Sequence, residues 1–70
     1  MMPLTMIKPG SRASIKKVGG REETRQFLAT LGFIPGSYVT VITQINGNVI
    51  VNIKESRVAV SREMAVKIMV

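Results

Sequence analysis

The fold of this chain is decided by the stretch LGFIPGSYVTV, residues 31–41. Leading into it, residues recur at the i, i+3, i+4 and i+7 positions of one helix face: Thr24, Phe27, Leu28 and Leu31. This spacing predicts a helix over residues 21–31 that packs these side chains against the core. Gly32 can adopt the left-handed conformation that ends a helix, and Pro35 prevents the helix from resuming.

The pattern changes to period two directly after this corner. Val39 and Val41 alternate with Tyr38 and Thr40, which predicts a strand with one apolar face. The stretch therefore predicts a short helix that is joined to a strand by a tight corner of glycine and proline.

The composition indicates one small domain, residues 1–70, that is held together by burial alone. The chain is 46% hydrophobic and has no cysteine, so no disulfide supports its core and a reducing compartment suits it. It begins without the charged and apolar regions of a signal peptide, and no apolar run is long enough to span a membrane. We therefore expect a cytoplasmic chain without a transmembrane segment.

The chain is strongly basic, with 10 lysines and arginines against 4 glutamates and a net charge of +6. Such an excess attracts nucleic acid, anionic lipid or an acidic protein. The basic residues are scattered along the chain, and the aromatic side chains that usually stack on bases number only two phenylalanines and one tyrosine. We expect no specific nucleic-acid partner.

The hairpin expected at Asn46-Gly47 has two alternative registers. A two-residue loop would place Val41 opposite Asn52. A three-residue loop, with Asn48 in the left-handed conformation, would place Val41 opposite Ile53. A slip of one residue turns every side chain to the other face of the sheet, so the apolar pattern favours the three-residue loop.

The remaining segments complete a mainly β pattern. Residues 11–18 predict a first strand that is interrupted at Lys17. A tight connection at Glu55-Ser56 pairs the apolar residues of its two strands: Ile53 with Val58, and Val51 with Val60. Ser61 is placed to cap a short helical turn over residues 62–65, before a last strand at residues 68–70. We predict a small antiparallel β-barrel of about five strands, with one short helix inserted after the first strand.

The chain lacks the side chains that most catalysis and transition-metal binding require. It has no histidine, cysteine or aspartate, and its only side-chain carboxylates are those of Glu22, Glu23, Glu55 and Glu63. We therefore expect that the chain is not an enzyme, with no catalytic residue, no cofactor and no resident metal. A weak metal site at Glu22 or Glu23 stays open as an alternative.

The surface around the helix and its exit offers an interface instead. Arg21 and Arg25 lie one turn apart, and their guanidinium groups suit carboxylates of a partner. Phe33 and Ile34 follow the helix, and Tyr38 opens the next strand. Exposed apolar groups beside charges are typical of protein interfaces. We predict a partner interface at these five residues.

Three motifs run through nearly the whole chain: Leu4-x-x-Ile7-x-Pro9-Gly10, Arg25-x-x-Leu28-x-x-Leu31-Gly32-Phe33-x-Pro35-Gly36-x-x-Val39-x-Val41 and Val58-Ala59-Val60-Ser61-Arg62-x-x-Ala65-x-x-Ile68-x-Val70. On these motifs the chain resembles the FeoA (ferrous iron transport protein A) family. The resemblance implies an SH3-like β-barrel with a helix inserted after the first strand. It also implies a cytoplasmic accessory protein of bacterial ferrous iron uptake, which binds the permease FeoB through its cytosolic GTP-binding part.

Two other functions remain possible beside the one that the resemblance implies, and the sequence differs from the family pattern at one point. The same domain occurs at the C-terminus of metal-dependent repressors, but this chain has no winged-helix portion. A metal-binding or metal-sensing accessory domain and a basic nucleic-acid-binding barrel are the alternatives, and pairing of edge strands would allow a weak homo-oligomer. The hairpin at residues 46–48 is shorter than in many members of the family. The sequence leaves open whether binding to FeoB affects GTP hydrolysis, channel gating or assembly of the complex.

Overall fold

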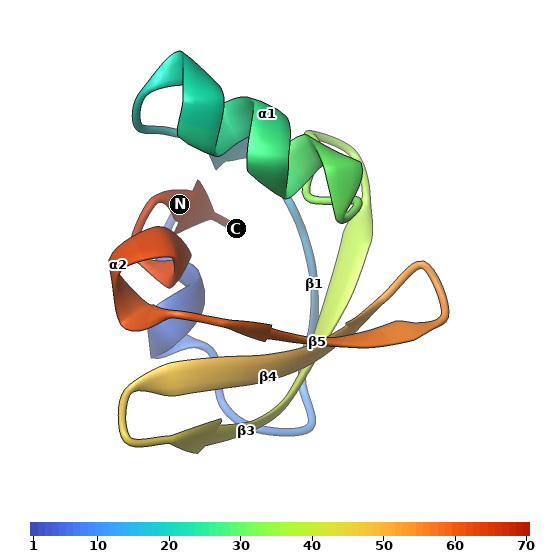
Figure 1. The fold of residues 1–70 in the computed structure, drawn as a ribbon. Coiled ribbons are helices and arrows are strands. Elements are labelled where there is room, and N and C mark those ends of the chain that lie inside the picture. Colours follow the sequence, from blue (N-terminus) through green and yellow to red (C-terminus); the bar gives the residue numbers. More distant parts are fainter.

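The computed structural model describes residues 1–70 and is mainly β, as predicted (Figure 1). Its elements, in chain order, are the 3-10 turn η1 (Leu4–Met6), β1 (Arg12–Ser14), β2 (Lys17–Val18), α1 (Glu22–Thr30), β3 (Tyr38–Ile45), β4 (Asn48–Ile53), β5 (Ser56–Val60), α2 (Arg62–Ala65) and β6 (Ile68–Met69). The strands form a four-stranded antiparallel sheet of order β1-β3-β4-β5 and a two-stranded sheet of β2 and β6.

The count of strands is six rather than about five, because the first predicted strand serves both sheets. The amide of Ile15 donates to Ser37 O at 2.8 Å, next to the β1–β3 ladder. The next amide, of Lys16, donates to Met69 O at 2.8 Å, in the other sheet. The chain therefore changes sheets between two consecutive residues, and the side chain of Ile15 is buried where it does so.

Helix α1 ends in a Schellman motif at the predicted glycine. Gly32 has φ +103°, and its amide donates to Ala29 O at 3.0 Å while the amide of Phe33 donates to Leu28 O at 3.0 Å. In this motif the residue after the glycine contacts the last turn of the helix through its side chain. Phe33 and Leu28 are accordingly both members of the buried core.

Two aromatic side chains near the helix have environments opposite to those predicted. Phe27, expected in the core, is 50% exposed, whereas Phe33, expected at the surface, is only 1% exposed. The helix is short and buries a narrow stripe: Leu28 fully, with Thr24 and Leu31 half-buried beside it. The helix-terminating motif then supplies the large core side chain that Phe27 does not.

The β3–β4 hairpin has a two-residue loop, so the predicted three-residue loop is wrong. Asn46 and Gly47 have φ +52° and +86°, as a type I′ turn requires, and Ile45 pairs with Asn48. Asn48 therefore belongs to β4 and does not take the left-handed position. The local preference of Asn-Gly outweighed the apolar pattern at this end of the hairpin.

A β-bulge restores the apolar pattern further along the same hairpin. The register shifts between Val41 and Thr43, so that Ile42 has no partner and Val41 lies opposite Val51. The extra residue changes the face of the sheet to which the side chains on one side of the bulge point. The buried valines of both strands therefore lie on one face. The structure thereby satisfies both the turn residues and the apolar face, which neither predicted register did.

The β4–β5 turn lies one residue before the predicted position. Lys54 and Glu55 have φ +52° and +63°, and Ile53 pairs with Ser56. Val51 and Val58 therefore face each other. The pairing differs from the predicted one by an even number of residues, so the same side chains still point inward.

The C-terminal part matches its prediction. Ser61 caps α2, its Oγ accepting a hydrogen bond from Met64 N at 3.4 Å, and Ala65 is fully buried. One core of twelve residues fills the molecule: Leu4, Ile15, Leu28, Phe33, Val39, Val41, Val49, Val51, Ile53, Val60, Ala65 and Ile68. These residues come from η1, α1, α2 and strands of both sheets, so a single core joins the two sheets and the helices.

Gly32 also permits a close approach of the β4–β5 turn. A Cβ atom at this position would lie 2.8 Å from Lys54 Cγ, nearer than side chains approach one another. The aliphatic stem of Lys54 therefore lies against the end of α1, where only glycine leaves room for it.

The two phenylalanines test which aromatic ring supports the fold. We expect Phe33→Ala to reduce the free energy of unfolding by about 3–5 kcal/mol, because it empties a fully buried site. Phe27→Ala should cost less than about 1 kcal/mol, since half of its side chain is already in water. Urea unfolding monitored by circular dichroism measures both values. A larger loss for Phe27→Ala would contradict the observed packing.

Gly32 and Gly36 have similar positive φ angles, and comparing substitutions at the two tests the contact between Gly32 and Lys54. Gly32→Ala and Gly36→Ala both place a side chain at positive φ, which costs about 1–2 kcal/mol. Gly36 has no atom within 4 Å of the added Cβ, whereas Gly32→Ala must also displace Lys54. We therefore expect the larger loss of unfolding free energy for Gly32→Ala, again by urea denaturation. Equal losses would show that Lys54 moves aside without cost.

Candidate functional site

A groove of about 430 Å³ lies between the C-terminal end of α1 and the β4–β5 hairpin. Its lining includes Leu31, Gly32, Ile34, Lys54, Ser56 and Val58. The helix end and the hairpin tip are distant in sequence, and they meet here because Lys54 lies over Gly32. The groove therefore forms at the same glycine that ends the helix.

The lining of the groove is apolar with one positive charge. Leu31 and Val58 are half-buried beneath it, and Ile34 is 41% exposed beside them. Lys54 is the one charged residue of the lining. The hydroxyl of Thr30, which also lines the groove, already donates to Phe27 O at 2.5 Å. The groove can thus accept an apolar group with a neighbouring negative charge, and it presents no nucleophile–base pair.

Ile34 is the predicted interface residue that the structure places in the groove. Phe33 is buried, so the expectation of an exposed Phe33 is wrong: the Schellman motif turns it inward and leaves its neighbour Ile34 outside. Lys54 and Val58 are groove residues that sequence reasoning missed. No local pattern marks them, because only the folding of the hairpin onto the helix end brings them to Ile34.

The other three predicted interface residues lie outside the groove. Arg21 is the N-cap residue of α1 and Arg25 lies one turn further on, and both side chains are exposed. Tyr38 is 56% exposed, and the guanidinium carbon of Arg12 lies 4.3 Å from the centroid of its ring. Tyr38 is therefore a partly covered ring on the first residue of β3, held by a cation–π contact.

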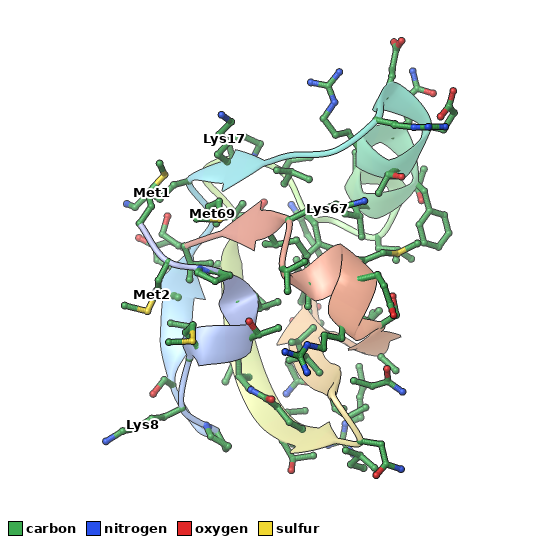
Figure 2. The ribbon with its side chains drawn as sticks, turned by 90° about the vertical axis from the view of Figure 1, so that its left-hand side faces the viewer. Met1, Met2, Lys8, Lys17, Lys67 and Met69 are labelled. Atoms are coloured by element: carbon green, nitrogen blue, oxygen red, sulfur yellow. The ribbon has the colours of Figure 1, made fainter.

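A second surface combines methionines and lysines near the chain ends. Figure 2 shows Met1, Met2, Lys8 and Lys17 along one side of the molecule. Met69 lies opposite Lys17 in the small sheet and is half-buried.

The carboxylates are spread over separate elements. Glu22 and Glu23 belong to the first turn of α1, Glu55 to the β4–β5 turn and Glu63 to α2. Glu22 Oε1 accepts a hydrogen bond from Gln26 Nε2 at 3.3 Å. No group of three or more histidine, cysteine, aspartate or glutamate side chains converges anywhere in the structure.

The helices are short relative to a lipid bilayer. The longer one, α1, has 9 residues, and no helix combines the length and the apolar character needed to cross a membrane.

Comparison with known proteins places this geometry in a family. The FeoA domain model matches residues 2–70. A protein of Methanocaldococcus jannaschii, assigned as an Fe(2+) transport protein A, is 39% identical over 70 residues, which cover 100% of this chain and 85% of that protein.

Solved structures agree with the fold. The crystal structure of an iron uptake regulatory protein, FeoA, superposes with a TM-score of 0.87 at 26% identity, covering 97% of this chain and 90% of that one. The zinc complex of Stenotrophomonas maltophilia FeoA, described as a procaryotic SH3 domain protein, gives a TM-score of 0.84 at 19% identity, with 99% and 88% coverage. These superpositions confirm the predicted small SH3-like fold.

Proposed function

The chain belongs to the FeoA domain family, as its sequence resemblance predicted, and we propose that it is a cytoplasmic accessory protein that binds the cytosolic GTP-binding part of the FeoB permease. The family is named for ferrous iron transport. The observation that carries the proposal is the groove between α1 and the β4–β5 hairpin, where Ile34 is exposed beside Lys54. A site of this kind suits binding, because it combines an apolar surface with one charge.

The interface that we propose is centred on Ile34. An isoleucine that remains 41% exposed over a half-buried floor gains most when a partner covers it. Arg21, Arg25 and Tyr38 would lie toward the margin of the contact, where charged residues affect the rate of association more than its strength. Phe33 contributes from below, by holding the corner on which Ile34 stands.

The net charge of the chain supports an acidic partner surface. The chain carries +6, and Lys54 is the one charged residue in the lining of the groove. Opposite potentials on two surfaces accelerate their encounter and select among partners. The proposed partner surface therefore has a negative charge beside an apolar residue.

A titration followed by NMR tests the proposed function. The isotope-labelled chain is mixed with the cytosolic GTP-binding domain of its own permease near physiological salt. We expect shifts to cluster on the groove, at Leu31, Ile34, Lys54 and Val58. Absence of any shift up to millimolar concentrations would contradict binding to this domain, and shifts confined to the β2–β6 sheet would contradict the groove.

Two exposed isoleucines provide a matched pair of variants. Ile34→Asp should weaken binding of the GTP-binding domain at least tenfold, because it places a charge in the apolar groove. Ile45→Asp makes the same change at the far end of β3, where Ile45 is 55% exposed, and should bind nearly as well as the unmodified chain. Isothermal calorimetry measures the affinities, and thermal melting confirms that both variants are folded. Equal affinities for the two variants would remove Ile34 from the interface.

A further inference from the structure

Strand β5 has a free edge. In the sheet order β1-β3-β4-β5 it has a neighbour on one side alone. Figure 1 shows β4 on one side of β5; on the other side the next element is the end of α1, and the groove lies between it and the strand. An edge of this kind exposes backbone donors and acceptors that another strand can use.

The register identifies which backbone groups are free. The two-residue turn at Lys54 and Glu55 makes Ile53 and Ser56 a hydrogen-bonded pair. Bonded and non-bonded positions alternate along an antiparallel ladder, so Arg57 and Ala59 point their N–H and C=O groups away from β4. Neither residue takes part in any of the 21 backbone hydrogen bonds outside the helices and strands, and both are exposed.

The edge has few of the features that usually prevent strand addition. Proteins protect their edges with proline, bulges, inward-pointing charges or a covering segment. Strand β5 pairs with β4 in unbroken register over all five of its residues and contains no proline. Its one charge, on Arg57, is exposed and would attract an acidic strand.

The groove lies where a strand added to β5 would place its side chains. Ser56 and Val58 line the groove, and they alternate along β5 with Arg57 and Ala59. Side chains of neighbouring strands that share a face lie about 5 Å apart. Alternate side chains of an added strand would therefore lie beside Val58 and enter the groove, which Leu31 and Ile34 also line.

The charges around this edge select an acidic segment. Lys54 lines the groove and Arg57 lies on the strand itself, whereas Glu55 in the turn is the one carboxylate of the hairpin. A carboxylate on the added strand can reach the ammonium group of Lys54 while its apolar neighbour at i+2 enters the groove.

We propose that an extended segment of the protein partner, with an apolar residue and a carboxylate at alternate positions, adds to the free edge of β5. The N–H and C=O groups of Arg57 and Ala59 pair with its backbone, its apolar side chain covers Val58 and Ile34, and its carboxylate meets Lys54. This inference rests on the proposed function, because the segment belongs to the same cytosolic partner.

Amide hydrogen exchange tests the proposal without altering the chain. In the free chain, the amides of Arg57 and Ala59 should exchange fast and that of Val58 slowly, because Val58 is bonded within the β4–β5 ladder. In the presence of the GTP-binding domain, exchange at Arg57 and Ala59 should slow by at least tenfold. Binding that leaves both amides in fast exchange would overturn strand addition and leave the proposed function standing.

Other outcomes of the same experiment show whether β5 pairs with a second copy of the chain or with nothing. If the unmodified chain shows no binding to the domain, both the proposed function and this inference fail. If Arg57 and Ala59 become protected without the domain, in proportion to the concentration of the chain itself, the edge pairs with a second copy and the partner segment is excluded.

Variants at Ala59 test the backbone contact in binding assays. Ala59→Pro removes an outward N–H that takes no part in the β4–β5 ladder, and we expect at least a tenfold loss of affinity with the melting temperature largely retained. Ala59→Val retains the N–H and should bind within about threefold of the unmodified chain. A similar loss in both variants would point to a side-chain effect and overturn the backbone pairing. If Ala59→Pro fails to fold, the exchange measurement decides.

Charge reversal tests the carboxylate contact. Lys54→Glu should weaken binding at least tenfold, whereas Lys8→Glu makes the same change of net charge on the surface seen in Figure 2 and should weaken it less than threefold. Equal losses would mean that only the total charge matters and would overturn the contact at Lys54.

Discussion

The end of helix α1 at Gly32 is the constraint on which the rest of the structure depends. Its positive φ allows the chain to reverse, and the amides of Gly32 and Phe33 donate hydrogen bonds to Ala29 O and Leu28 O, the last carbonyl groups of the helix. The reversal carries Phe33 into the core, while the missing Cβ lets Lys54 lie against the helix end. One residue thus fixes the helix to the core on one side and to the β4–β5 hairpin on the other.

The sheets show how local and distant preferences are reconciled in a small domain. Asn46-Gly47 imposes a tight turn, and the bulge at Ile42 then returns the valines of β3 to the inner face. Between Ile15 and Lys16 the chain leaves one sheet for the other, so one extended segment helps to cover both ends of a single core. Irregular positions of this kind let short strands enclose a core without long connections.

The functional character of the molecule follows from what its surface offers. The chain belongs to a family named for ferrous iron transport, and its fold is SH3-like, a scaffold whose functions depend on the surface that each member presents. Here the distinctive surface is an apolar groove beside a free strand edge and one lysine. It forms where the helix end meets the hairpin, so the feature that stabilises the domain also shapes its candidate binding site.

The sequence by itself determined the elements whose causes are local. Helical spacing and Gly32 predicted α1 and its end, and Ser61 predicted α2 with its cap, because these signals act within a few residues. Of the five residues of the predicted interface, four are exposed as expected, and Phe33 is buried. Only the tertiary structure decided that Phe33 is buried and Phe27 exposed, that the hairpin bulges at Ile42, and that Lys54 and Val58 join Ile34 in a groove. These outcomes depend on how the whole core is filled and on contacts between residues distant in the chain, which no short pattern contains.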